Sequence, residues 1–246
     1  MLGFIKRILG FSKKESIRIL MYHQVLPKKI SFKNNLVVTA ENLEEQLSYI
    51  KDNFQTIFFK DLEACKSLEN KVILTFDDGY YNNLEYLVPL LEKHQLKATI
   101  FIPTEFIQNT VNDFAKLYMN FEEIQSLNSN LVEIALHSHS HQNFSQLSVE
   151  EAERDLLKNM QILRENNIDF TKVLAYPYGR FPKEKIRKKE FFKMLEKIGI
   201  TSAVRIGNSI ESYPFKNKFE VNRIDIKYGD NLKKFKLKLM FGKTKF

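Results

Sequence analysis

Three of the five histidines in the chain lie within one five-residue window, His137-Ser-His-Ser-His141, directly after the apolar run at 131–136. His137 and His141 are four residues apart, so in a helical turn or a folded loop both imidazoles can face one point, as in half of a Zn²⁺ site. His139 lies between them and is expected to point elsewhere. The spacer holds no Glu, which excludes the HExxH pattern of zinc proteases. The alternative is a polar loop whose histidines hydrogen-bond to the backbone.

Two neighbouring carboxylates can complete such a half-site. Asp77 and Asp78 directly follow the apolar run VILTF at 72–76. A carboxylate at the end of a buried strand is unfavourable unless it is paired or binds a metal. One Asp, two His and a water form the open pattern of a catalytic metal site. Asp-Asp-Gly is also common in turns, and a simple turn is the alternative interpretation.

The elements that must position these residues alternate between two patterns. Short apolar runs predict buried strands at 17–22, 54–59, 72–76, 97–102, 131–136, 172–176, 201–206 and 221–226. Apolar residues at helical spacing predict a helix capped by Thr39 and further helices at 84–91, 121–127, 148–165 and 183–198. Buried strands separated by helices indicate parallel β/α units, so the predicted class is α/β. In such folds the chemistry lies at the carboxyl ends of the strands, where Asp77, Asp78 and the three histidines are expected.

Taken together, the motifs resemble those of the polysaccharide deacetylases, the NodB-homology or carbohydrate esterase family 4 enzymes. Ile73-Leu-Thr-Phe-Asp-Asp-Gly-Tyr80 is similar to their TFDDG motif, and the segment from His137 to His141 is similar to their H-S/T-x-x-H motif. Ala175-Tyr-Pro-Tyr-Gly179 resembles their third motif. The resemblance covers about residues 17–226 and implies a distorted, incompletely closed (β/α) barrel of the NodB-homology type.

The resemblance also implies roles for the first two motifs. Asp78, His137 and His141 would bind one divalent metal ion, for which we expect Zn²⁺, with Co²⁺, Ni²⁺, Mn²⁺ and Fe²⁺ as alternatives. Asp77 would be the general base. This division agrees with the chemistry of amide hydrolysis, in which a divalent ion activates water and polarises a carbonyl while a free carboxylate removes the proton.

The third motif is expected to contact the substrate. By resemblance, the backbone N–H of Tyr178 helps to stabilise the oxyanion that forms during hydrolysis, an interaction worth about two to three orders of magnitude in rate. Tyr176, Pro177 and Gly179 are the expected substrate-binding residues around it.

Two departures from the family pattern affect the mechanism. The third motif opens with Ala175, where the family has an Arg that orients the catalytic Asp, and no His follows Gly179 to act as the general acid. His23, in Leu20-Met-Tyr-His-Gln-Val25, resembles the M-Y-H-x-V opening of the branch whose motif order is circularly permuted, which includes poly-N-acetylglucosamine deacetylases. We therefore predict that His23 is the general acid, with a buried core histidine as the alternative. His94 is assigned no role.

Composition limits the remaining possibilities. The chain has 246 residues, of which 43% are hydrophobic and 28% charged, as in one globular domain. The single cysteine, Cys65, excludes an internal disulfide and a Cys-rich zinc module. No run approaches 18 consecutive apolar residues, so no membrane span is predicted. The first residues mix apolar and basic side chains and lack the features of a secretory signal, so we expect a location in the cytoplasm or at the cytoplasmic membrane face.

We divide the chain into a basic amphipathic segment at 1–16, a catalytic domain at 17–230 and a basic tail at 231–246. The tail carries six Lys and no acidic residue, which leaves little excess charge elsewhere in a chain of net charge +8. Because a basic tail is not a basic face, no nucleic-acid partner is predicted. The alternation of Lys with apolar residues at 233–240 predicts an edge strand, and the alternative is a peripheral contact with an anionic membrane.

These inferences predict a metal-dependent hydrolase that removes N-acetyl groups from amino sugars of a polysaccharide, oligosaccharide or glycolipid. An O-acetyl esterase acting on a glycan would need nearly the same metal chemistry. A carbohydrate-binding relative with little activity is the third possibility. The missing Arg at position 175 favours it, whereas the retained Asp77, Asp78, His137 and His141 do not.

Overall fold

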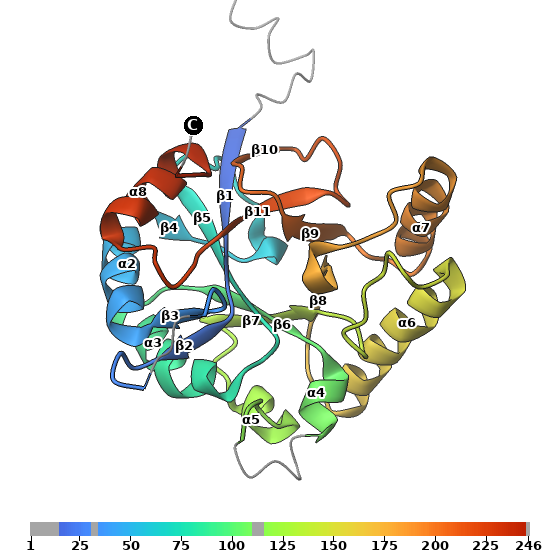
Figure 1. The fold of residues 1–246 in the computed structure, drawn as a ribbon, viewed down its shortest axis with the longest axis horizontal. Coiled ribbons are helices and arrows are strands. Elements are labelled where there is room, and N and C mark those ends of the chain that lie inside the picture. The colour runs from blue at the N-terminus through green and yellow to red at the C-terminus, as the bar shows by residue number, and fades with distance from the viewer. Residues whose placement is uncertain (1–14, 31–33, 110–115, 245–246) are drawn as a thin grey trace, which may run out of the picture.

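The computed structural model describes residues 15–30, 34–109 and 116–244, and its main feature is a barrel of parallel strands surrounded by helices (Figure 1). In the order in which they pair, the barrel strands are β1 (Glu15–Tyr22), β5 (Lys71–Asp77), β6 (Ala98–Ile102), β7 (Val132–Leu136), β8 (Thr171–Ala175), β9 (Ser202–Ile206) and β11 (Val221–Asp225). β11 pairs in turn with β1, so the ring is closed, where incomplete closure was expected. The barrel is distorted between β7 and β8, where the register shifts. The predicted α/β class and (β/α) barrel are confirmed.

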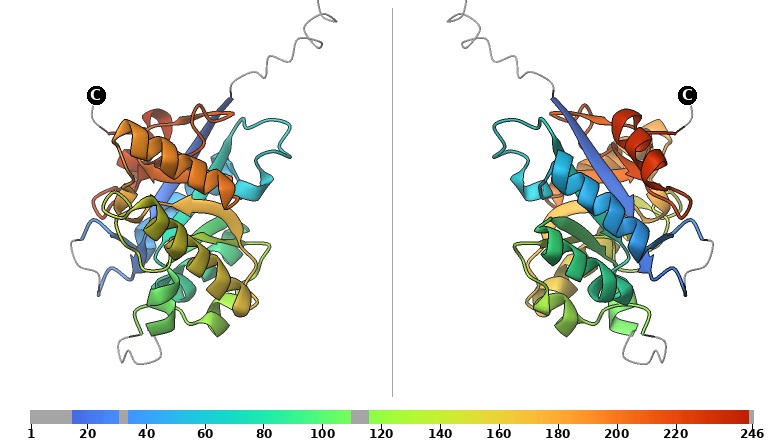
Figure 2. Two further views of the ribbon diagram at one scale, coloured as in Figure 1. Left: turned by 90° about the vertical axis from the view of Figure 1, so that its right-hand side faces the viewer. Right: turned by 90° about the vertical axis from the view of Figure 1, so that its left-hand side faces the viewer.

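Helices cover the outside of the barrel (Figures 1 and 2). They are α2 (Ala40–Asn53), α3 (Val88–His94), α4 (Thr104–Asn109), α5 (Phe121–Ser126), α6 (Val149–Glu165), α7 (Lys185–Lys197) and α8 (Leu232–Phe241). The two sequence-predicted helix caps are confirmed. The Thr39 side chain accepts a hydrogen bond from the backbone of α2, and Ser148 forms a capping box with Glu151 at the start of α6.

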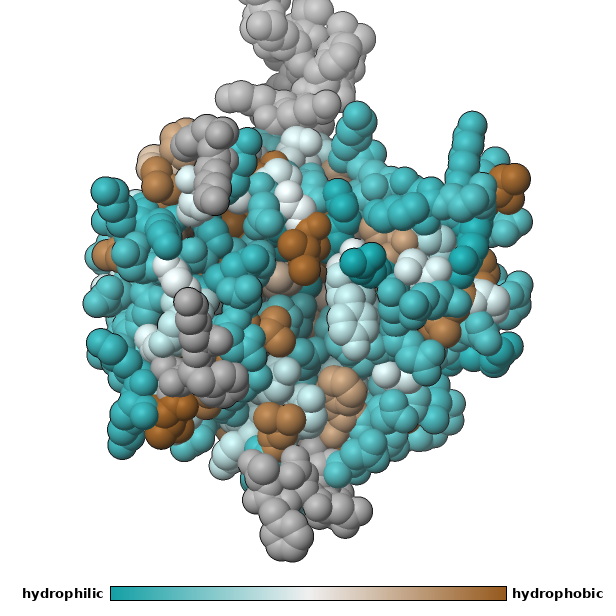
Figure 3. Space-filling model, viewed as in Figure 1, coloured by the Kyte–Doolittle hydropathy of each residue, from teal (hydrophilic) through white to brown (hydrophobic). Residues whose placement is uncertain are grey.

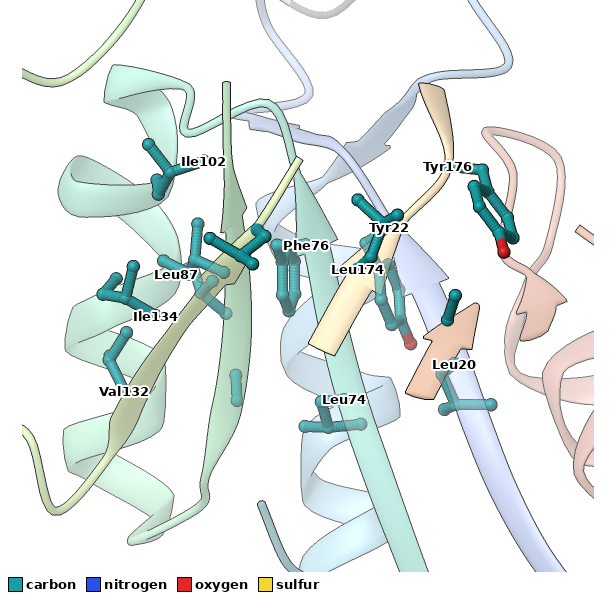
Figure 4. Close-up of a cluster of buried hydrophobic side chains, with 14 of the residues drawn as sticks. Leu20, Tyr22, Leu74, Phe76, Leu87, Ile102, Val132, Ile134, Leu174 and Tyr176 are labelled. Carbon is teal, nitrogen blue, oxygen red and sulfur yellow. The ribbon is translucent and has the colours of Figure 1, made fainter. Parts of the chain in front are cut away.

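Side chains alternate between the inside and the outside of the barrel, and this alternation places the polar residues. Outward-facing residues such as Tyr22 and Phe76, whose rings stack 4.9 Å apart, pack under the helices (Figure 4). The inward set on β5 begins with Ile73 and continues, two residues at a time, to Thr75 and Asp77. The same period-two rule on β11 places Arg223 inside with Val221. Asp77 and Arg223 therefore enter the barrel interior toward its carboxyl end.

Two predicted elements differ from the structure. Of the strand predicted at 54–59, only β4 (Gln55–Thr56) pairs with β5. The chain then turns into the short helix η1 (Phe59–Asp61), because the backbone N–H groups of Phe59 and Lys60 donate to the Glu133 carboxylate rather than to a neighbouring strand. The helix predicted at 84–91 begins as a π-helix, η2 (Asn83–Leu87), and continues as α3.

The edge strand predicted at 233–240 is wrong, because this segment forms helix α8. Asn231 caps its start and Gly242 ends it in a left-handed conformation. Phe235, Lys238 and Leu239 are buried, and their spacing is that of one face of a helix. The alternation of Lys with apolar residues that predicted a strand is therefore equally compatible with a helix. α8 packs beside α2, and the buried Lys238 ammonium pairs with Asp230. Packing against the barrel thus selected the helix.

The remaining elements are small. β2 (Gln24–Leu26) and β3 (Val37–Thr39) form a separate parallel pair, and β10 (Glu211–Tyr213) adds antiparallel to β1. Of the predicted N-terminal segment 1–16, residues 1–14 lie outside the described residues, and Glu15 and Ser16 belong to β1. Among the helices of the described residues, none has the length and apolar character needed to cross a bilayer.

Candidate metal and catalytic site

A cavity of about 890 Å³ opens at the carboxyl ends of the barrel strands. Most of the sequence-predicted residues line it, namely His23, Asp77, Asp78, His137, His141, Tyr176, Tyr178 and Gly179. Figure 3 shows one face of the molecule, mainly hydrophilic and hollowed near its middle, with a few apolar residues beside the hollow. The barrel thus brings together motifs that are separated by more than a hundred residues in the sequence.

Asp78, His137 and His141 form a cluster that fits a divalent metal ion. The Asp78 Oδ1 atom lies 3.3 Å from His137 Nε2 and 3.2 Å from His141 Nε2, and the candidate ligand atoms all lie within 4.8 Å of one another. Ligands about 2.0 Å from a tetrahedral ion are spaced about 3.3 Å apart. Asp78 Oδ1 is buried and has no hydrogen-bond partner within the described structure, as expected for an atom that donates to a cation. The donor set of one oxygen and two nitrogens suits Zn²⁺.

A backbone carbonyl orients the first histidine. His137 Nδ1 lies 2.7 Å from the carbonyl oxygen of Ala175. Because a carbonyl can only accept a hydrogen bond, Nδ1 carries the proton and Nε2 is left with its lone pair toward Asp78. Such an outer contact is the usual support of a metal-binding histidine. Ala175 therefore contributes its main chain to the site although its side chain departs from the family pattern.

The loop that carries the histidines is held by Asp155 of α6. The Asp155 carboxylate accepts hydrogen bonds from the backbone N–H groups of His139 and Ser140, at 2.8 and 3.0 Å, and from the Ser140 hydroxyl. Ser138 Oγ accepts a further bond from the His141 N–H, and both residues have positive φ angles. As predicted, His139 lies outside the cluster, with its Nδ1 2.9 Å from the Thr104 hydroxyl on α4.

The turn after β5 depends on glycine. Asp78 and Gly79 both have positive φ, 75° and 64°. A Cβ atom at Gly79 would lie 2.8 Å from Ile102 Cδ1, so a larger residue would need both a strained backbone and a shift of the Ile102 side chain. This turn places Asp77 inside the barrel and Asp78 at the rim beside the histidines.

Arg223 of β11 contacts Asp77 and was not among the residues expected at the site. Its guanidinium is buried and donates to Asp77 Oδ1 at 2.6 Å and to Asp77 Oδ2 at 2.7 Å. It also donates to the Thr75 hydroxyl at 3.1 Å. The available signal was a charged residue in the middle of the predicted buried strand VNRIDI at 221–226. A buried Arg needs a partner, and parallel strands offer one on a neighbouring carboxylate.

Asp77 and Asp78 stay ionised in this environment. Burial opposes the charge on Asp77, but Arg223 and then His137 outweigh it, so the pKa of Asp77 is lowered. Burial likewise opposes the charge on Asp78, and the imidazoles of His137 and His141 outweigh it, so the pKa of Asp78 is also lowered. The pKa of His137 is raised despite its burial, because Asp78 and Asp77 favour the imidazolium.

His23 lies at the cavity wall between β1 and β2. Its Nε2 atom is 3.9 Å from Asp77 Oδ2, and its side chain is 15% exposed. The position satisfies the geometric condition for a proton donor beside the catalytic carboxylate, and it differs from a histidine enclosed in the core. His94, in contrast, lies at the end of α3 and does not line the cavity.

The third motif forms the short helix η4 (Pro177–Gly179) at the cavity wall. Tyr178 has a positive φ of 58°, and its ring is 64% exposed and packs edge-on against His141. Tyr176 is buried and donates its hydroxyl hydrogen to the Phe219 carbonyl, so that group is not free for a substrate. Pro177 is buried and does not line the cavity, in contrast to the prediction that it contacts the substrate.

Comparison with known proteins places these features in a family. A family model described as polysaccharide deacetylase matches residues 66–201, more than half of the chain. YxkH of Bacillus subtilis, whose name refers to a polysaccharide deacetylase, is 26% identical over 196 residues, which are 77% of this chain and 66% of the relative. A poly-beta-1,6-N-acetyl-D-glucosamine N-deacetylase of Staphylococcus aureus is 27% identical over 202 residues, 71% of this chain and 68% of the relative. The chain spans about two thirds of the length of these relatives.

A solved structure gives the same fold. The Streptococcus pyogenes deacetylase PplD, in complex with acetate, superposes with a TM-score of 0.77 and 19% sequence identity. The alignment covers 94% of this chain and 100% of that chain. The likeness confirms the predicted (β/α) barrel of the NodB-homology type.

Proposed function

The chain belongs to the polysaccharide deacetylase family, and we propose that it is a metal-dependent hydrolase that removes N-acetyl groups from amino sugars of a glycan. The observation that carries the proposal is the cluster of Asp78, His137 and His141 in one open cavity, beside the carboxylate of Asp77, which is not part of the cluster. The bound ion, for which we propose Zn²⁺, would activate water and polarise the acetyl carbonyl. Asp78, His137 and His141 are the residues that would hold it.

In this mechanism Asp77 acts as the general base. Its lowered pKa keeps it ionised at neutral pH, and Arg223 holds its carboxylate by two hydrogen bonds. Asp77 removes a proton from water as the water oxygen bonds to the carbonyl carbon of the acetyl group. The backbone N–H of Tyr178 is the proposed donor to the oxyanion that develops.

His23 acts as the general acid in the second half of the reaction. As the bond between the carbonyl carbon and the sugar nitrogen breaks, the leaving amine needs a proton, and imidazole titrates near neutral pH. The 3.9 Å separation of His23 Nε2 and Asp77 Oδ2 supports this assignment, because both groups reach the same reacting centre. Acetate and a glycan amine are the products.

The substrate we propose is a polymer or oligomer that contains N-acetylglucosamine. The name of the Staphylococcus aureus relative refers to poly-β-1,6-N-acetyl-D-glucosamine, which supports an N-acetylated amino sugar as the unit bound. The exposed ring of Tyr178 and the apolar side chain of Ile206 beside it can pack against a sugar face. O-deacetylation of a glycan remains the second candidate, since the cavity would present the same groups to an ester.

Acetate release tests the function directly. The purified chain is loaded with Zn²⁺ and incubated with β-1,6-linked N-acetylglucosamine oligosaccharides and, separately, with an O-acetylated glycan. We expect acetate and free amine from the first substrate and loss of both after chelation. The matched variant His141→Ala should bind the ion far more weakly and release no acetate. If acetate were released only from the O-acetylated glycan, the chain would be an O-acetyl esterase and the N-deacetylase proposal would be wrong.

We also propose a peripheral contact between α8 and an anionic membrane. Lys233 and Met240 are exposed on its outer face, and Leu237 lies between them beside a shallow apolar groove. Basic and apolar residues on one face are typical of helices that bind at the lipid surface. Co-sedimentation with vesicles containing an anionic lipid should weaken in Lys233→Glu/Met240→Ser. Unchanged co-sedimentation would exclude α8 as the contact.

A further inference from the structure

A second groove, distinct from the catalytic cavity, lies between α7 and the segment 215–219. Its volume is about 860 Å³, and seven of the residues that line it are lysines, whereas Glu196 is the one acidic residue among them. Phe192, Phe215 and Phe219 provide apolar surface in the same groove. We call these residues the α7 groove. Helix α7 faces the viewer in the left panel of Figure 2.

Among the described residues, most lysines of the α7 groove form no ion pair within 4.0 Å. Lys188 pairs with Glu220, and Lys218 pairs with Glu196. Within the described residues no ion pair involves the other five, which are Lys183, Lys185, Lys189, Lys193 and Lys216. Uncompensated charge of one sign along a concave surface concentrates ions of the opposite sign. The α7 groove is therefore an electrostatic site for an anion.

Cationic residues connect the α7 groove with the catalytic cavity. Arg180 is exposed on the cavity wall, directly after the third motif, and Lys183 of the groove follows three residues later. Arg205 precedes Ile206, which lines the cavity. Burial and the charges of Arg205 and Lys188 lower the pKa of Lys183, whereas the Glu220 carboxylate opposes this shift. Arg180 and Lys183 therefore place positive charge on both sides of Phe181 and Pro182, between the cavity and the α7 groove.

We propose that the α7 groove binds anionic groups of the glycan whose N-acetyl group enters the cavity. This inference rests on the proposed function and narrows its substrate class to an acidic glycan, with carboxylate or phosphate substituents. A polymer with repeated anionic groups can contact several of these lysines at once. The same charge would repel the ammonium groups produced by deacetylation, so acetylated units would be favoured over product.

Binding of charged and neutral glycans tests the proposal without requiring catalysis. The full chain is titrated with a hyaluronan octasaccharide, which alternates N-acetylglucosamine with a carboxylate sugar, and with a neutral N-acetylglucosamine oligosaccharide of the same length. Long-chain polyphosphate is the phosphate probe. We expect the anionic probes to bind more tightly than the neutral one, with an affinity that falls as salt is added.

Charge reversal locates the site. Lys189 and Lys193 are exposed, are four residues apart on α7 and both line the groove. Lys189→Glu/Lys193→Glu should weaken anion binding by about ten-fold or more, since each exposed ion pair lost contributes up to about five-fold. The matched control, Lys51→Glu/Lys234→Glu, changes the net charge equally on α2 and α8, across the barrel from α7 (Figure 1). It should change affinity by less than about two-fold.

The outcomes separate this inference from the proposed function. Equal weakening in both double variants, or no binding of either anionic probe, overturns the inference. Duplex DNA bound more tightly than both probes would reassign the groove to nucleic acid and also overturn it. Anion binding localised to α7 without acetate release from any glycan would leave the groove established and refute the deacetylase proposal alone. Comparison of hyaluronan with polyphosphate decides which anion is preferred.

Discussion

Arg223 and Asp77 are 146 residues apart in the sequence, yet they form a bidentate pair inside the barrel, with distances of 2.6 and 2.7 Å. β11 pairs with β1, and β1 pairs with β5, so the guanidinium reaches across the barrel interior to the last residue of β5. Both oxygens of the carboxylate accept a bond, which fixes its orientation. In the proposed mechanism this pair would take the place of the arginine that is missing at position 175.

Arg223→Gln tests this pair through the pH dependence of the rate. Without the cation, burial dominates and the pKa of Asp77 rises, so the base becomes protonated at a higher pH. We expect the acidic limb of the pH–rate profile to move to higher pH and turnover to fall about 10- to 100-fold. Removal of one partner from a buried pair should also destabilise the fold by about 3–5 kcal/mol, measurable by denaturant unfolding.

The control for this prediction is Arg223→Lys, which keeps the charge and loses the two-pronged geometry. In Arg223→Lys the acidic limb should lie close to its wild-type position, but turnover should recover only in part. An acidic limb that stays in place in Arg223→Gln would show that Asp77 does not determine it.

Asp77 and Asp78 should separate catalysis from metal binding. Asp77→Asn should retain the bound metal and lose several orders of magnitude in turnover, because only the base is removed. Asp78→Asn should lose metal affinity, because Asp78 lies 3.2–3.3 Å from both histidine nitrogens. Metal content by elemental analysis, compared with acetate release, distinguishes the two. If Asp77→Asn also lost the metal, the two roles would be reversed or shared.

His23→Gln should keep the fold and the metal while turnover falls about two to four orders of magnitude. The alkaline limb of the pH–rate profile should disappear, because that limb reports deprotonation of the acid. His94→Gln, at the end of α3 and away from the cavity lining, is the matched control and should be near wild type. Near-normal turnover in His23→Gln would contradict this assignment, because another group would then have to protonate the leaving amine.

Asp155→Asn tests the support of the histidine loop. The amide offers one acceptor oxygen where the carboxylate offers two, so it cannot serve the His139 and Ser140 N–H groups as Asp155 does. We expect a loss of about 10- to 100-fold in Zn²⁺ affinity of the metal-free protein, measured by competition with a chelator. Glu153→Gln, two residues away on the same helix and paired with Lys197, should leave the affinity unchanged.

The sequence by itself determined the strands and the residues at their ends. Apolar runs such as VILTF can be buried on both faces only in a covered parallel sheet, so the polar residues that follow, Asp77 and His137 among them, had to lie at one rim. The local motifs also fixed the turn at Gly79 and the helix cap at Ser148, because these depend on residues within a few positions.

Only the tertiary structure decided which distant residues meet. Arg223 is an isolated charge in a strand, and nothing near it in sequence names Asp77 as its partner; the closure of the barrel does. The segment 233–240 fits both periods, and burial of Phe235 and Leu239 beside α2 selected the helix. Tyr176 and Pro177 belong to a motif next to the site, but packing turned them toward the core. Local sequence sets which conformations are available, and the energy of burial, which is shared between distant segments, chooses among them.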